Sequence, residues 1–113
     1  MRRGIFKQGQ RKEKDMNIIK TGEGNALNIA LEGRLDTTTA PQLDGEIKAS
    51  VEGLQELTFD LAGLDYISSA GLRVLLSAQK VMNRQGEMVI RNVKPEIMEI
   101  FEVTGFVDIL TIE

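Results

Sequence analysis

The fold of this chain is decided around one stretch, Asp65-Tyr66-Ile67-Ser68-Ser69-Ala70-Gly71-Leu72-Arg73. An apolar, strand-like run at residues 57–61 precedes it, and apolar residues with helical spacing continue from it to Met82. The stretch therefore predicts a strand followed directly by a helix, with Ser68 and Ser69 at the corner between them. Because the first turn of a helix leaves backbone N–H groups without partners, the simplest role of these hydroxyls is to cap the helix.

The segments on either side of this corner alternate between strand and helix patterns. Period-two alternation around Gly22-Glu23-Gly24-Asn25 predicts an antiparallel hairpin. The other predicted elements are a helix at about 40–51, opened by Thr37-Thr38-Thr39-Ala40-Pro41 and ended by Gly53, a strand at 88–90, a helix from Lys94-Pro95 to Gly105, and a strand at 107–110. The order β-β-α-β-α-β-α-β places the chain in the α/β class and predicts a small mixed sheet flanked by helices.

Composition limits the kinds of function open to the chain. Its 113 residues fit a single domain, and they include no Cys and no His. A Ser-His-Asp triad, thiolate metal sites and His-containing zinc sites are therefore excluded. No apolar run approaches the roughly 20 residues that a membrane span needs, so we expect no membrane insertion and a cytoplasmic location. An enzyme that uses Asp36, Asp65 or Ser69 remains an alternative, but no general base is paired with a nucleophile in the sequence.

Charge divides the chain into two parts. Residues 1–15 carry six basic and two acidic side chains, a net of +4, and because the whole chain is −3, residues 16–113 carry −7. We expect 1–15 to be a disordered basic N-terminal tail, or sequence upstream of a start at Met16, and 16–113 to be the folded domain. A basic arm for nucleic acid or anionic lipid is the alternative for the tail. The acidic body argues against nucleic-acid binding by the folded part.

The two serines at the predicted strand-to-helix junction have a second interpretation besides capping. Ser68, Ser69, Ala70 and Gly71 are all small, so another protein could approach the backbone closely there. A phosphate on Ser69 would lie at the positive end of the helix dipole. Arg73, one helical turn further on, could reach such a phosphate.

The same stretch resembles the signature of STAS-domain proteins, specifically the bacterial anti-sigma factor antagonists. Gly33-Arg34-Leu35-Asp36, followed by Thr39-Ala40, is similar to a second segment of that family. Gly86-Glu87-Met88-Val89-Ile90 and the helix that ends at Gly105-Phe106 are similar to its later part. The resemblance covers residues 16–113 and implies the STAS fold.

The resemblance also implies a mechanism. The unphosphorylated chain would bind an anti-sigma factor, itself a serine/threonine kinase, and free a sigma factor. Phosphorylation at Ser69, with Ser68 as second choice, would switch the chain off, and a serine phosphatase would restore it. The implied partner-binding residues are Asp36, Thr37, Ser68, Ser69, Ala70, Gly71 and Arg73.

In this mechanism the chain itself needs no cofactor and no metal, because the partner supplies both. Many close antagonists have Asp at the position of Ser68 and Ser or Thr at that of Ala70, which leaves the identity of the kinase open. The alternative function is a STAS accessory or scaffold subunit of a transporter or signalling complex, without a phosphorylation cycle.

Overall fold

The computed structural model describes residues 6–13 and 16–113, with side chains from Met16 onward. Its elements in chain order are β1 (Phe6–Glu13), β2 (Met16–Glu23), β3 (Ala26–Leu35), α1 (Ala40–Ser50), β4 (Glu56–Ile67), α2 (Ser69–Met82), β5 (Glu87–Arg91), α3 (Pro95–Thr104) and the 3-10 helix η1 (Phe106–Asp108). The described strands form one sheet in the order β1-β2-β3-β4-β5. The pairs β1/β2 and β2/β3 are antiparallel, whereas β3/β4 and β4/β5 are parallel. The predicted α/β class with a mixed sheet is therefore confirmed.

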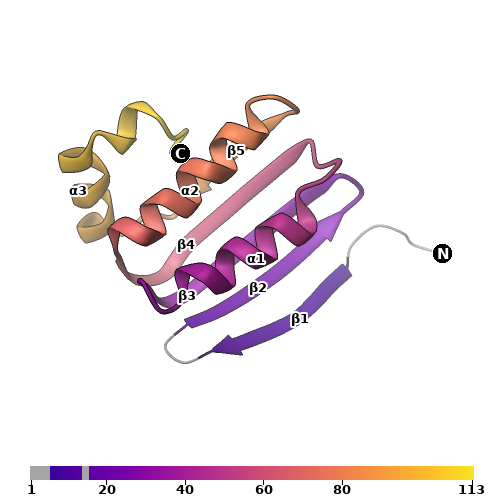
Figure 1. Cartoon of the computed structure of the whole chain (residues 1–113), viewed down its shortest axis with the longest axis horizontal. Coiled ribbons are helices and arrows are strands. Elements are labelled where there is room, and N and C mark those ends of the chain that lie inside the picture. The colour runs from indigo at the N-terminus through magenta and orange to yellow at the C-terminus, as the bar shows by residue number, and fades with distance from the viewer. Residues whose placement is uncertain (1–5, 14–15) are drawn as a thin grey trace.

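Helices α1 and α2 lie side by side across one face of the sheet, and α3 lies beside the end from which α2 starts (Figure 1). Under the helices, one row of buried side chains crosses four strands in register: Lys20, Ile29, Phe59 and Ile90. Their neighbours along each strand point to the opposite face and are partly buried or, at Arg91, exposed. The core therefore lies between the sheet and α1 and α2.

The charged member of this row joins α1 to the sheet. Lys20 Nζ donates hydrogen bonds to Glu46 Oε1 at 2.9 Å and to Ser50 Oγ at 2.8 Å, both on α1. A buried ammonium group needs such partners, because leaving it unpaired would cost several kcal/mol. The pair fixes the position of α1 over β2.

Local signals in the sequence correspond to the observed turns and caps. Glu23 pairs with Ala26 across a two-residue turn in which Gly24 has φ 63°, as a tight hairpin requires. Pro41 lies in the first turn of α1. The third helix ends at Gly105 in the left-handed conformation, with φ 82°.

The ends of the chain differ from the sequence-based expectations. The disordered tail predicted for residues 1–15 is wrong for residues 6–13, whose backbone pairs with β2; residues 1–5 and 14–15 lie outside the described part. Pairing satisfies N–H and C=O groups that β2 would otherwise expose at the edge of the sheet, and it needs no apolar alternation. The strand predicted at 107–110 is instead η1 followed by a single parallel bridge from Ile112 to Ile90.

Candidate functional site

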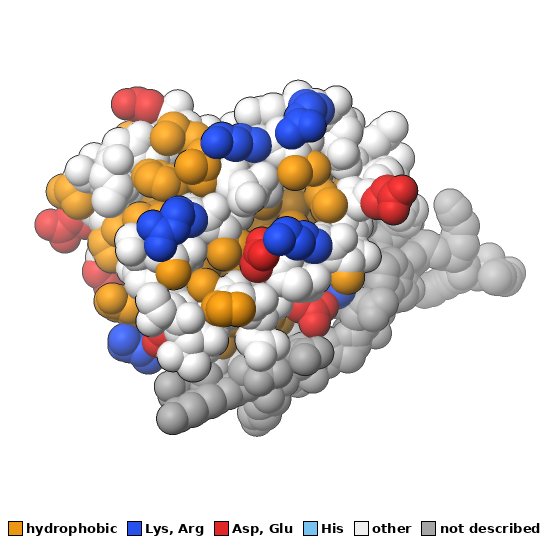
Figure 2. Space-filling view, in the orientation of Figure 1, with side chains coloured by type: hydrophobic (Ala, Val, Ile, Leu, Met, Phe, Trp, Pro, Cys, Tyr) orange, Lys and Arg blue, Asp and Glu red, His pale blue; other side chains and the backbone are white. Residues whose placement is uncertain are grey.

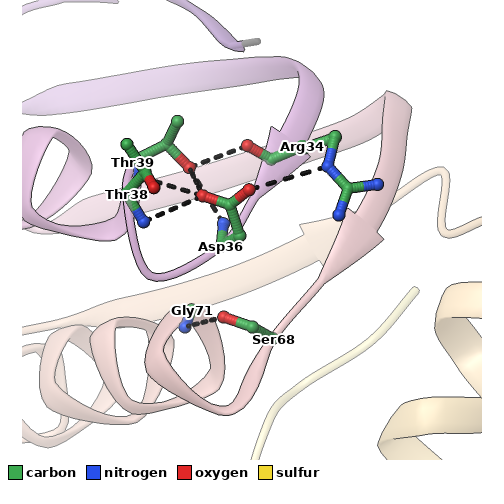
Figure 3. Close-up of polar contacts among 6 residues, drawn as sticks. All are labelled: Arg34, Asp36, Thr38, Thr39, Ser68 and Gly71. Atoms are coloured by element: carbon green, nitrogen blue, oxygen red, sulfur yellow. Dashed lines mark hydrogen bonds and ion pairs between the residues drawn. The ribbon is translucent and has the colours of Figure 1, made fainter. Parts of the chain in front are cut away.

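The site is built where the parallel strands β3 and β4 end. β3 continues into the loop before α1, and β4 continues directly into α2 (Figure 1). The Ser68 N–H donates a hydrogen bond to the Leu35 carbonyl oxygen at 2.9 Å. This bond joins the two strand ends and brings the loop at 36–39 beside the start of α2, as Figure 3 shows. We call these two segments, residues 34–39 and 66–73, the serine corner.

The two adjacent serines have different environments. Ser68 is the N-cap of α2: its backbone is extended, and its Oγ accepts a hydrogen bond from the Gly71 N–H at 3.3 Å. Ser69 is the first residue of α2 and is exposed, and within residues 6–13 and 16–113 its hydroxyl has no hydrogen-bond partner. Ser68 therefore has a structural role, whereas the Ser69 hydroxyl is accessible to a reagent.

Gly71 lies on the inner side of α2. A Cβ at this position would lie 2.7 Å from Leu35 Cγ and 2.9 Å from Ile67 Cγ1. Because real carbon atoms do not approach so closely, only glycine lets α2 contact the ends of β3 and β4 in this way. Gly71 is buried, so it positions the corner but adds nothing to its outer surface, in contrast to the surface role that the sequence suggested.

Asp36 organises the other half of the corner. Its Oδ1 accepts hydrogen bonds from the N–H groups of Thr38 at 2.9 Å and Thr39 at 3.1 Å (Figure 3). The Thr39 hydroxyl donates to the Arg34 carbonyl oxygen at 2.7 Å, and it accepts from the Asp36 N–H at 2.9 Å. Asp36 therefore closes a local turn with Thr38 and Thr39, a common role of aspartate.

These contacts keep Asp36 ionised. The hydrogen bond from the Thr39 backbone N–H is the largest influence, and it lowers the pKa of Asp36 below the ordinary aspartate value. Burial opposes this effect, while the Thr38 N–H, the Thr39 hydroxyl and the charge of Arg34 add to it. At neutral pH the corner therefore holds a fixed negative charge close to the start of α2.

An aromatic-cation pair lies beside Asp36 and was missed from the sequence as part of the site. The Arg34 guanidinium stacks 4.2 Å from the centroid of the Tyr66 ring, and its Nε lies 3.6 Å from Asp36 Oδ2. Arg34 and Tyr66 are in-register partners on β3 and β4. The signal in the sequence is their equal spacing, since each stands two residues before a corner residue, Asp36 or Ser68.

The remaining predicted site residues line a shallow groove between α1 and α2. Thr37, Ala70 and Arg73 contribute to it, together with residues of α1, and its volume is 390 Å³. Its floor includes Ala40, Ala70 and Val74, and Lys48 and Arg73 stand at its rim. Of the predicted partner-binding residues, the groove therefore collects Thr37, Ala70 and Arg73. Asp36, Ser68 and Ser69 are their chain neighbours and do not line the groove, and Gly71 is buried.

Two of the three residues considered for catalysis, Asp36 and Asp65, have structural partners. Asp65 accepts an ion pair from Lys94 Nζ at 2.6 Å, at the start of α3, and Asp36 is engaged within its own loop. Across the described residues no cluster of three acidic, His or Cys side chains could hold a metal ion. None of the helices within that same part of the chain is long and apolar enough to cross a membrane.

The chain thus combines a small mixed sheet with an exposed serine at the start of a helix. The STAS domain family model matches residues 17–113, and the chain belongs to the STAS domain family. Among its relatives, Bordetella bronchiseptica BtrV carries the provisional name of an anti-sigma factor antagonist and is 44% identical over 88 residues, 76% of each chain. The anti-sigma-B factor antagonist of Listeria monocytogenes is 34% identical over 104 residues, 87% of this chain and 90% of that protein.

Solved structures agree with the fold. An anti-sigma factor antagonist from Mycobacterium paratuberculosis superimposes with a TM-score of 0.78 at 19% identity, covering 86% of this chain and 84% of that one. The phosphorylated form of the Bacillus cell fate determinant SpoIIAA gives a TM-score of 0.63 at 15% identity, covering 96% and 91%. At these identities the likeness establishes the fold alone.

Proposed function

We propose that this protein is an anti-sigma factor antagonist whose binding is switched by phosphorylation at Ser69. The unphosphorylated chain binds a kinase-type anti-sigma factor and frees the sigma factor. Phosphorylation of Ser69 ends this binding, and a serine phosphatase restores it. The names of the two curated relatives support the antagonist role, and the phosphorylated SpoIIAA structure is a precedent for the modification within the same fold.

The observation that carries the choice of acceptor is the difference between the two serines. Ser68 Oγ is engaged with the Gly71 N–H, and its removal would cost the helix a cap of about 1 kcal/mol. Ser69 is exposed and its hydroxyl has no partner among the described residues. Of these two serines, only Ser69 can be phosphorylated without the loss of a helix cap.

The chemistry is divided between this chain and its partners. The Ser69 hydroxyl oxygen attacks the γ-phosphorus of ATP, an O–P bond forms, the bond to ADP breaks, and the hydroxyl proton passes to a base on the kinase. The phosphatase reverses the state by attack of water on the phosphorus, which releases inorganic phosphate and the free hydroxyl. This chain supplies a hydroxyl and a docking surface.

The physical effect of the modification is local. A phosphoserine adds a charge of about −1.5 to −2 and considerable bulk to a surface of small residues. Since the N-terminus of a helix favours an anion, α2 should remain folded. Asp36 directly follows Leu35, whose carbonyl oxygen accepts the hydrogen bond from the Ser68 N–H, and repulsion by its ionised carboxylate adds to the steric effect of the phosphate.

The experiment combines phosphorylation with a binding measurement. We would incubate the chain with the purified kinase-type anti-sigma factor encoded in the same genome, together with ATP and Mg²⁺, and map the phosphopeptide. Phosphate should appear on Ser69, disappear in Ser69→Ala and persist in Ser68→Ala. The phosphorylated chain should bind the same factor at least about 100-fold more weakly, a difference of about 2.7 kcal/mol, with unchanged circular dichroism.

Two outcomes would contradict the proposal. One is phosphate on another residue while Ser69 stays unmodified. The other is tight binding by a chain that mass spectrometry shows to be fully phosphorylated at Ser69.

A further inference from the structure

The basic side chains of the domain divide into two groups. Residues 16–113 contain eight Lys and Arg residues. Five of them form ion pairs: Lys20 with Glu46, Arg34 with Asp36, Lys48 with Asp44, Arg91 with Glu113, and Lys94 with Asp65. The other three, Arg73, Lys80 and Arg84, are exposed and have no acidic partner among the described residues.

These three side chains lie on one line along α2. At about 100° per residue, positions 69, 73, 80 and 84 fall within about 60° of one another around the helix. Arg84 lies just beyond the C-cap, where its N–H still donates to the Val81 carbonyl oxygen at 3.1 Å and continues the turn. We call Arg73, Lys80 and Arg84 the basic stripe; Ser69 stands at its head.

The stripe is unusual in this domain because its surroundings are acidic. Residues 16–113 carry a net charge of −7, whereas residues 69–84 contain three basic and no acidic side chains. Figure 2 shows most of the basic groups over α1 and α2, and most of the acidic groups at the margin of this face. Asp44, an acidic residue of α1, is paired with Lys48.

From these observations we infer that the basic stripe is the docking surface for an acidic face of the anti-sigma partner, and that phosphate on Ser69 acts partly by neutralising it. The inference rests on the proposed function and adds the chemistry of the partner surface. Unpaired charges along a line of about 22 Å from Ser69 to Arg84 attract a complementary acidic surface and orient it toward the hydroxyl. A phosphate four residues before Arg73 is placed to pair with it, which would reduce the stripe from +3 to about +1.

The groove beside the stripe favours a protein over a polyanion as the occupant. Its floor is formed by the small or apolar residues Ala40, Ala70 and Val74, which can receive an apolar side chain. Nucleic acid and anionic lipid headgroups offer charge but no side chain to fill such a groove. A nucleic-acid site also needs a more extended basic surface than three unpaired cations on a domain with a net charge of −7.

The test reverses one charge on the stripe and one elsewhere. Arg84→Glu removes an unpaired cation far from Ser69, and Arg91→Glu on β5 makes the same change in net charge at an exposed arginine off the stripe. Association with the kinase-type anti-sigma factor is measured at about 50 mM and about 300 mM salt, because screening separates charge from contact effects. Arg84→Glu should slow association about tenfold at low salt and much less at high salt, whereas Arg91→Glu should change it less than about twofold.

The readouts separate failure of this inference from failure of the proposed function. If the wild-type chain neither binds the factor nor is phosphorylated at Ser69, the proposed function fails. If wild type is phosphorylated and Arg84→Glu associates as fast as Arg91→Glu, the stripe is not the docking surface. Binding of wild type to phosphatidylglycerol vesicles that is lost in Arg84→Glu, with kinase association unaffected, would assign the stripe to a membrane instead and overturn the inference.

Discussion

Substitution of Gly71 by alanine tests the packing that positions the serine corner. The new methyl group would lie 2.7 Å from Leu35 Cγ and 2.9 Å from Ile67 Cγ1, about 1 Å inside the optimal carbon–carbon separation. Leu35 is fully buried and Ile67 is 3% exposed, so neither side chain can move into solvent. The added atom must therefore move α2 away from the ends of β3 and β4.

The expected cost follows from two opposing terms. Overpacking of a core by one carbon costs about 1–3 kcal/mol. Alanine is favoured over glycine in a helix by about 0.5–1 kcal/mol, which offsets part of that cost. We expect Gly71→Ala to lower the free energy of unfolding by about 1–2 kcal/mol, which corresponds to a fall of several degrees in Tm for a domain of this size.

Gly45 provides the matched control. It lies in the middle of α1 and is exposed, and a Cβ added there would have no heavy atom within 4 Å. Gly45→Ala should therefore raise the free energy of unfolding by about 0.5–1 kcal/mol. Urea unfolding followed by circular dichroism measures both variants under the same conditions. If Gly71→Ala proved as stable as Gly45→Ala, the close contact of α2 with the two strand ends would be refuted.

Two further substitutions test the halves of the corner separately. Ser68→Ala removes the N-cap and should cost about 1 kcal/mol of stability in urea unfolding, while Ser69 is still phosphorylated; unchanged stability would refute the capping role. For Asp36, hydrogen bonding holds the pKa below the unfolded value, so the ionised group stabilises the fold above that unfolded value, and this stabilisation is lost as the pH falls through the lower folded pKa. Wild type should therefore exceed Asp36→Asn in urea midpoint at pH about 7, with the difference shrinking below pH about 4. A difference that is constant between these pH values would show that the charge of Asp36 is not involved.

Local sequence patterns predicted most of the helices, strands and turns, because the conformation of these elements depends on residues that are neighbours in the chain. The hairpin at Gly24, the helix that starts at Pro41 and the C-cap at Gly105 all depend on the conformational preferences of single residues. Strand β1 was missed because it pairs at the edge of the sheet through its backbone. Such pairing does not require the apolar alternation by which a strand is recognised in a sequence. The strand predicted at 107–110 failed because an apolar run cannot by itself distinguish a strand from a tight turn.

The sequence predicted those features of the site that lie within one continuous segment, but not the contacts between segments that are distant in sequence. Ser68 and Ser69 are recognisable as a helix start, and the structure assigns the cap to Ser68. The burial of Gly71 depends on Leu35, which is distant in sequence and comes close only through the parallel pairing of β3 and β4. The stack of Arg34 on Tyr66 depends on that same register and could not be derived from either residue alone.

The hydrogen bond from Ser68 to Leu35 has a consequence for how partners associate with this domain. It joins the end of β3, which leads into the loop at 36–39, to the N-cap of α2 before any partner arrives. Docking at a surface whose backbone is already ordered avoids much of the loop entropy that association otherwise costs. Differences in affinity among partners can then arise from single side chains on a constant scaffold, so specificity can diverge without any change in the fold.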